Sequence, residues 1–184
     1  TNHQMSYSSI TELNGNKHFN FNDHNQQLFD IYSNEHNTGV PLGMPSFEST
    51  VNPLHQIQGL GPVILKVNEL PITASILTNV FGLNIFAEYH PYEDSTQAIQ
   101  VFKIGEGGLG GELHLYEAET EINNEDVGMV EQIEFSTQNK SEFENAKQTL
   151  DDIGIPYQTL EQDDSDSLRI TEKSGISFIY TLEK

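Results

Sequence analysis

Residues 61–82 read GPVILKVNELPITASILTNVFG, and this segment carries two structural signals in succession. A run of branched aliphatic side chains from Pro62 to Val67 predicts a strand. Between Pro71 and Phe81 the apolar residues recur at helical spacing along one face, at Ile72, Ile76, Leu77 and Val80. Pro71 suits the first turn of a helix, and Gly82 is typical of the position just after the last turn. We therefore expect a strand followed by an α-helix.

Three more strands are expected after this helix, at 84–89, 98–104 and 112–117. An acidic turn at Glu93-Asp94 separates the first two, and the glycine-rich segment 105–111 separates the last two. That segment lacks the lysine and hydroxyl residue of a phosphate-binding loop and does not open a helix, so we expect a mobile hairpin over the mouth of a cupped sheet. The predicted order of elements is βαβββ.

The same order returns after Gly128. A strand at 129–135 precedes a helix at 140–153, which Gly154 closes, and three strands follow at 157–160, 168–171 and 176–182. Ser141 and Glu144 resemble a capping box, and four apolar residues form the expected inner face of the helix, namely Phe143, Ala146, Leu150 and Ile153. The predicted fold class is α+β, built of paired βαβββ units with mixed curved sheets.

The first part of the chain resembles the end of a third unit. Segments 18–21 and 28–32 predict a hairpin like the last hairpin of each complete unit, and the segment after it shows little periodicity. We expect four parts, which are a terminal hairpin of a preceding unit (1–33), a linker (34–57) and two βαβββ units (58–120 and 121–184). Because a lone hairpin has no core, we expect it to belong to a longer polypeptide with residues before Thr1.

Composition excludes several partners and sites. The formal net charge is −20, from 28 acidic and 8 basic side chains, which disfavours nucleic acid and anionic membranes as partners. The absence of cysteine excludes a disulfide scaffold and thiolate chemistry and fits a cytoplasmic location. No apolar run approaches the roughly 20 residues of a membrane span. These features predict an acidic cytoplasmic protein.

Paired βαβββ units resemble the vicinal oxygen chelate superfamily, which includes glyoxalases, bleomycin-resistance proteins and extradiol dioxygenases. Within it, segments 57–65, 81–83, 107–115, 128–130 and 175–178 look like the carboxy-terminal portion of MhqO-type ring-cleaving dioxygenases. The resemblance implies an enzyme that cleaves hydroquinone-like or catechol-like rings. A weaker resemblance to CppA-like proteins implies instead a non-catalytic member that binds a small ligand or scaffolds a dimer.

The resemblance also implies a divalent metal, such as iron, manganese or zinc, held by histidines on first strands and a glutamate on a last strand. The histidine pair of the fourth unit falls on Glu131 and Gln132 here, so this pair replaces the expected ligands. The glutamate of the second unit falls near Asp30. The terminal glutamate falls near Ile179 or Tyr180, which makes Tyr180 the expected catalytic residue. A small aromatic substrate and a homodimer are the partners implied.

Among the seven histidines, His114 is the best candidate for binding a ligand. It alternates with Leu113 and Leu115 along an expected strand, so its side chain leaves the apolar face and points into the cup. The competing interpretation is a histidine that only satisfies hydrogen bonds within the sheet. No pair of histidines has HxxxH or HxH spacing.

Overall fold

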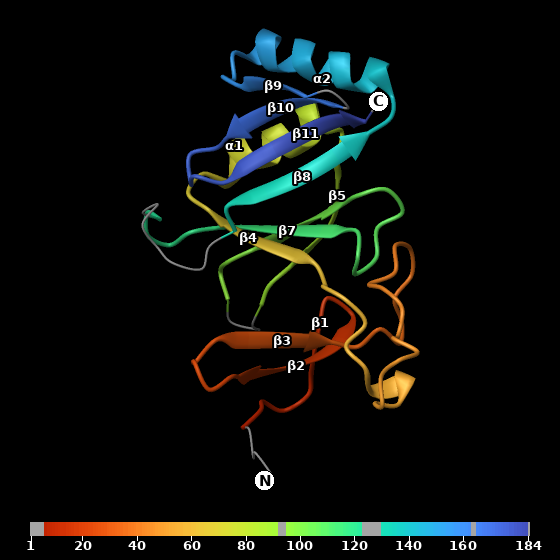
Figure 1. Cartoon of the computed structure of the whole chain (residues 1–184). Coiled ribbons are helices and arrows are strands. Elements are labelled where there is room, and N and C mark those ends of the chain that lie inside the picture. Colours follow the sequence, from red (N-terminus) through yellow and green to blue (C-terminus); the bar gives the residue numbers. More distant parts are fainter. Residues whose placement is uncertain (1–5, 92–94, 123–129, 163–164, 184) are drawn as a thin grey trace.

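The computed structural model describes residues 6–91, 95–122, 130–162 and 165–183. Within them the chain forms three β-sheets that follow one another along the molecule, with the hairpin sheet at one end and helix α2 at the other (Figure 1). The first sheet has the order β1-β2-β3 and is antiparallel, with β1 (Thr11–Leu13), β2 (Asn16–Asn22) and β3 (Leu28–Tyr32). The predicted hairpin is therefore present, and β1 extends it by one short strand.

The first complete unit begins with β4 (Val63–Val67), followed by helix α1 (Leu70–Ser75) and a π-helical turn, η2 (Ile76–Val80). Strands β5 (Asn84–Tyr89), β6 (Ile99–Lys103) and β7 (Glu112–Glu117) complete it. The sheet order is β4-β7-β6-β5, so the first strand lies parallel beside the last, as a helical crossover requires.

The second unit repeats this topology in the order β8-β11-β10-β9. Its elements are β8 (Gln132–Thr137), α2 (Lys140–Ile153), β9 (Gln158–Gln162), β10 (Ser165–Thr171) and β11 (Ser177–Glu183). Strands β8 and β11 are again parallel. The predicted α+β class with paired βαβββ units is confirmed.

Local details differ from the sequence prediction. Asn139 caps α2, since its side-chain oxygen accepts from the backbone N–H of Ser141 and Glu142, so the predicted capping box at Ser141 is wrong. Ile72 and Ile153, expected to face inward, are 38% and 45% exposed. The turn predicted at Glu93-Asp94 and the predicted start of the strand at Met129 lie outside the described residues.

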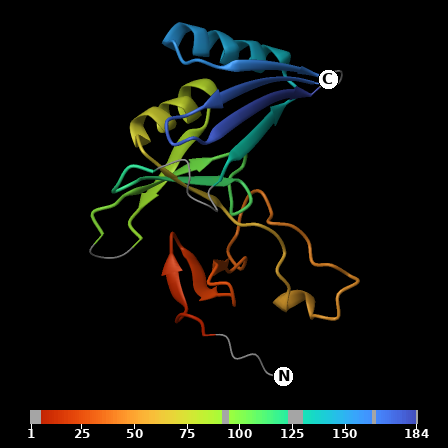
Figure 2. The same ribbon diagram turned by 60° about the vertical axis from the view of Figure 1, so that its left-hand side comes forward.

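One hydrophobic core joins the two units. It includes Leu77 from η2, Leu115 from β7, Leu150 from α2 and Phe178 from β11, all almost fully buried. Phe81, which follows η2, reaches into the second unit, where its ring centroid lies 4.9 Å from that of Phe135. The turned view shows α1 between the two complete sheets (Figure 2). Packing of this kind holds the two units as one body.

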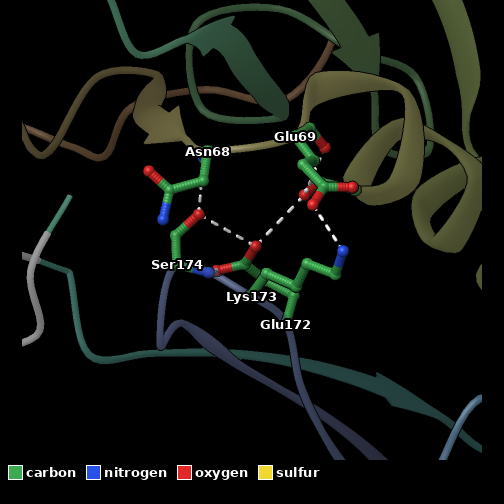
Figure 3. A network of polar contacts seen from close by, with 6 residues as sticks. Asn68, Glu69, Glu172, Lys173 and Ser174 are labelled. Atoms are coloured by element: carbon green, nitrogen blue, oxygen red, sulfur yellow. Dashed lines mark hydrogen bonds and ion pairs between the residues drawn. The ribbon is translucent and has the colours of Figure 1, made fainter. Parts of the chain in front are cut away.

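A buried polar network reinforces the joint (Figure 3). The Glu172 carboxylate, in the turn between β10 and β11, accepts hydrogen bonds from Ser174 of its own turn and from Thr73 Oγ1 of α1 at 3.3 Å. Ser174 Oγ in turn accepts the backbone N–H of Asn68 at 2.7 Å. Nearby, Lys173 pairs with Glu69 on the surface. The turn of one unit is thereby fixed to the strand and helix of the other.

The segment predicted as a linker is folded against the glycine-rich turn. It contains a 3₁₀ helix at Pro53–His55, and its Val40 N–H donates to Gly107 O at 2.6 Å. A Cβ atom at Gly108 would lie 2.1 Å from Thr38 O, so only glycine permits this approach of the two backbones. Segment 105–111 thus forms the predicted turn between two strands, and it packs against the preceding segment.

The hairpin sheet repeats part of a complete unit. Strands β1, β2 and β3 have the same antiparallel order as β5, β6 and β7. In the described residues no strand pairs with the outer edge of β3, where β4 and β8 stand in the two units. None of the described helices is long and apolar enough to cross a membrane.

Candidate functional site

The space between the hairpin sheet and the β4–β7 sheet forms a cup whose two walls carry polar side chains. On β7, Leu113 and Leu115 enter the core, whereas Glu112 and His114 belong to the opposite face because side chains alternate along a strand. Tyr89 of β5 lies on the same side as His114 and contacts it. The alternation that suggested His114 from the sequence thus places it on this face, where both ring nitrogens are hydrogen-bonded to residues of the same sheet, as the competing interpretation expects.

Three residues of this wall form a hydrogen-bonded chain. His114 is 2% exposed, its Nδ1 lies 3.0 Å from Tyr89 Oη, and its Nε2 lies 3.1 Å from Glu112 Oε2. Burial, followed by the charges of Asp30 and Glu112, raises the pKa of Tyr89 to about 12, so the phenol keeps its proton near neutral pH. In the neutral imidazole, Tyr89 therefore donates to Nδ1, while the Nε2–H donates to the Glu112 carboxylate.

The hairpin supplies the opposite wall. His18 Nδ1 lies 2.9 Å from Asp30 Oδ1, and the His18 ring stacks on that of Tyr32 at 5.5 Å between centroids. The Tyr32 hydroxyl is buried, and it lies beside the Asp30 carboxylate without a hydrogen bond of good geometry to any described residue. Burial is the main cause that raises the pKa of Tyr32, and the Asp30 charge, the charge of Tyr89 and the interaction of the hydroxyl with the Asp30 carboxylate add to it. The two walls therefore act on each other electrostatically.

We call Asp30, Tyr32, Tyr89, Glu112 and His114 the polar cluster. It offers phenolic donors and carboxylate acceptors within one partly buried space, and the Tyr32 hydroxyl has no hydrogen bond of good geometry among the described residues. A buried hydroxyl whose hydrogen bond is poorly formed gains free energy from a better partner, so a ligand that accepts from Tyr32 would be favoured. Such a cluster can orient an oxygen-bearing ligand.

Two hollows adjoin this region. The first, which we call the mouth hollow, has a volume of about 310 Å³ and is lined by Glu112 together with Lys103, Phe86, His36 and the glycine-rich turn. Glu112 thus belongs both to this hollow and to the polar cluster. The second is a groove of about 940 Å³ between the hairpin and the start of β4, lined by Asp30 and Tyr32 of the polar cluster and by apolar side chains such as Phe19, Leu54 and Ile64. Both volumes fall within or near the usual range for small-molecule sites.

The donor set of the described residues does not fit a metal ion. The polar cluster and its neighbour His18 contain two separate pairs, His18 with Asp30 and His114 with Glu112. No group of three or more histidine, aspartate or glutamate side chains suited to a metal occurs within the described ranges. A divalent metal normally needs at least three protein ligands. No step involving a metal is therefore derived for this part of the chain.

The structure separates the five residues singled out in the sequence. Asp30 and His114 lie on the two walls of the cup. Tyr89 is hydrogen-bonded to His114, and the charge of Asp30 helps to raise the pKa of Tyr89. Glu131 and Gln132 are exposed at the start of β8, in the other unit. Tyr180 lies in the hydrophobic core at 8% exposure, packed on Phe81 and Phe143, and on the opposite face of its sheet from Gln132. Burial raises its pKa, so the phenolate is disfavoured.

Sequence reasoning did not single out Tyr32, Tyr89 or Glu112. Glu112 could have been found, since it lies two residues before His114 and a strand returns to the same face at that spacing. Tyr32 and Tyr89 had no such signal, because they reach the cup only once the hairpin faces the sheet.

Comparisons with known proteins add to this geometry. No family model matches the chain, and no curated protein matches it. A putative dioxygenase from Bacillus subtilis has a solved structure that matches 97% of this chain with a TM-score of 0.64 and 18% identity. The chain spans 54% of that protein. A glyoxylase/bleomycin resistance protein/dioxygenase domain from Frankia matches 70% of this chain over its whole length, with a TM-score of 0.55 and 18% identity.

The chain has the vicinal oxygen chelate fold. The fosfomycin resistance protein FosX from Listeria monocytogenes, in a variant solved with Mn(II) and a dihydroxypropylphosphonic acid, matches 70% of this chain and 95% of its own, with a TM-score of 0.54 and 17% identity. At such identities the likeness establishes the fold and no activity. Proteins with quite different activities share the vicinal oxygen chelate fold, so function must be argued from the residues of this chain.

Proposed function

We propose that this protein binds a small aromatic ligand bearing hydroxyl groups in the cup between the hairpin sheet and the β4–β7 sheet. The observation that carries the proposal is the buried hydroxyl of Tyr32, which lies beside the Asp30 carboxylate without a hydrogen bond of good geometry among the described residues, close enough to Tyr89 for the two phenols to act on each other. A phenolic ligand can accept from Tyr32 and donate to Asp30. Aromatic side chains on both walls suit a flat ring.

Binding of catechol, measured by titration calorimetry, tests this proposal. Tyr32→Phe removes this donor and should weaken catechol binding by roughly fivefold to tenfold, the usual effect of one neutral hydrogen bond. Tyr7→Phe is the matched control, because Tyr7 is 74% exposed and lies outside the polar cluster. The proposal fails if catechol does not bind, or if the two variants lose affinity equally.

A second candidate is a ring-cleaving dioxygenase in which this chain is one portion of the enzyme. Two observations favour it, namely the match of nearly the whole chain to about half of a putative dioxygenase, and the unpaired outer edge of β3 within the described residues. In that case the substrate would be a hydroquinone or a catechol, and metal ligands would have to come partly from other residues. Cytoplasmic location and a homodimer stay predictions.

Elemental analysis of the longest natural polypeptide that contains this chain separates the two candidates. Stoichiometric iron, manganese or zinc, with oxygen uptake on adding hydroquinone, would support the enzyme. Metal content that stays at background would overturn it. Gln132→Ala tests the expected ligand position on β8, since unchanged metal content removes Gln132 from the metal site.

A further inference from the structure

The mouth hollow brings together three segments that are distant in sequence. Asn16 comes from β2, His36 from the segment after the hairpin, and Lys103 from the end of β6, next to the glycine-rich turn. Glu112 at the start of β7 also lines the hollow, and its hydrogen bond to His114 connects it to the rest of the polar cluster. The hollow therefore shares one wall residue with the candidate site.

Backbone contacts fix the walls of the hollow. Asn37 Oδ1 accepts the backbone N–H of Leu109 at 2.7 Å, and Val40 N–H donates to Gly107 O at 2.6 Å. Gly108 and Thr38 approach too closely for any side chain at position 108. A hollow held by such contacts is preformed, so a ligand does not have to order it.

The charges in the hollow are arranged in a distinctive way. Lys103 and Glu112 are direct cross-strand neighbours, yet Lys103 forms no ion pair within the part of the chain that the structure describes. The Lys103 stem passes over Gly107, and its ammonium lies 5.7 Å from the centre of the Phe86 ring. The Glu112 carboxylate is hydrogen-bonded to His114 instead of pairing with Lys103. A cation and an anion thus lie in one hollow without neutralising each other.

We propose that the mouth hollow binds the charged end of an aromatic α-amino acid, with the ligand carboxylate on Lys103 and its ammonium on Glu112. The carboxylate of Glu106 also lines the hollow and repels a simple anion. A zwitterion instead offers the lysine and the carboxylates a group of the opposite charge. The ring of the ligand then extends past Glu112 toward the polar cluster. This inference rests on the proposed function and deepens it, because it names the charged groups that the hydroxyl-bearing ligand carries.

Four related compounds test the inference by titration calorimetry with the intact chain. L-tyrosine carries both charges, tyramine lacks the carboxylate, hydroxyphenylpropionate lacks the ammonium, and ethylphenol lacks both. L-tyrosine should bind at least about tenfold more tightly than tyramine or hydroxyphenylpropionate, since a charge-assisted hydrogen bond is lost with each group. Lys103→Met should bring L-tyrosine down to the affinity of tyramine.

Two further variants serve as controls. Lys66→Met removes an exposed lysine of β4 outside the hollow, and it should leave the preference for L-tyrosine intact. Lys103→Arg keeps the charge and should retain most of that preference, which separates loss of charge from loss of folding. Equal affinity for all four compounds overturns the inference and leaves the proposed function standing. Binding of none of the four, nor of catechol, overturns both.

Discussion

Asn68, the residue just after β4, donates its backbone N–H to Ser174 Oγ in the turn between β10 and β11, at 2.7 Å (Figure 3). The same Ser174 hydroxyl donates a hydrogen bond to the Glu172 carboxylate at 3.0 Å. Glu172 is 6% exposed and also accepts from Thr73 of α1. A buried carboxylate satisfied by donors from both units acts as a joint between them.

Glu172→Gln should therefore destabilise the whole molecule. The carboxylate oxygens accept from two backbone N–H groups and two hydroxyls, and an amide would turn one acceptor into a donor facing donors. We expect a loss of about 1–3 kcal/mol in the free energy of unfolding, measured with urea. Lys173→Met breaks only the neighbouring surface pair with Glu69 and should cost less than about 1 kcal/mol. Equal losses in the two variants would contradict the role of Glu172.

Tyr180, the expected catalytic residue, should behave as a core residue. Tyr180→Ala removes a ring packed on Phe81 and Phe143 and should lower the free energy of unfolding by about 3–5 kcal/mol. Tyr180→Phe keeps the ring and should leave both stability and catechol binding close to those of the native chain. A large loss of binding or turnover in Tyr180→Phe, with unchanged urea unfolding, would restore a catalytic role for the hydroxyl.

The repeated topology could be predicted from local signals, whereas the site could not. Gly82 and Gly154 mark the ends of the two helical segments, and both have positive φ, as predicted for residues that close a helix. His114 could be placed by the alternation of β7 alone. The cup, however, depends on how the hairpin docks, and no local pattern encodes the approach of Tyr32 to Tyr89. Likewise, the glycines of 105–111 indicated a turn but not its partner at Val40.

The packing of the glycine-rich turn against the preceding segment can be tested by comparing two glycines within the turn. Gly108→Ala would place a Cβ atom 2.1 Å from Thr38 O, whereas a Cβ at Gly105 meets nothing within 4 Å. Both glycines have positive φ, so either alanine variant carries backbone strain. The difference in stability between the two variants therefore reports the contact of Gly108 with the preceding segment. Gly108→Ala should lower the free energy of unfolding by about 1–3 kcal/mol more than Gly105→Ala. It should also speed proteolysis within residues 34–57, and equal behaviour of the two variants would mean that the segment is not held there.

The raised pKa of Tyr89 predicts how stability depends on alkaline pH. An unfolded tyrosine loses its proton near pH 10, whereas Tyr89 in the folded chain does so at about 12. The unfolded state therefore binds fewer protons than the folded state between these values, so the free energy of unfolding should fall as the pH rises from about 10 to about 12. The contribution is complete below pH 10 and is lost as the pH passes the folded pKa.

Urea unfolding of Tyr89→Phe over this range should show a shallower fall in the free energy of unfolding than that of the native chain. Tyr7→Phe, at an exposed position, should keep the native slope. If the free energy of unfolding of Tyr89→Phe falls with pH as steeply as that of the native chain, the environment of Tyr89 beside His114 and Glu112 does not raise its pKa.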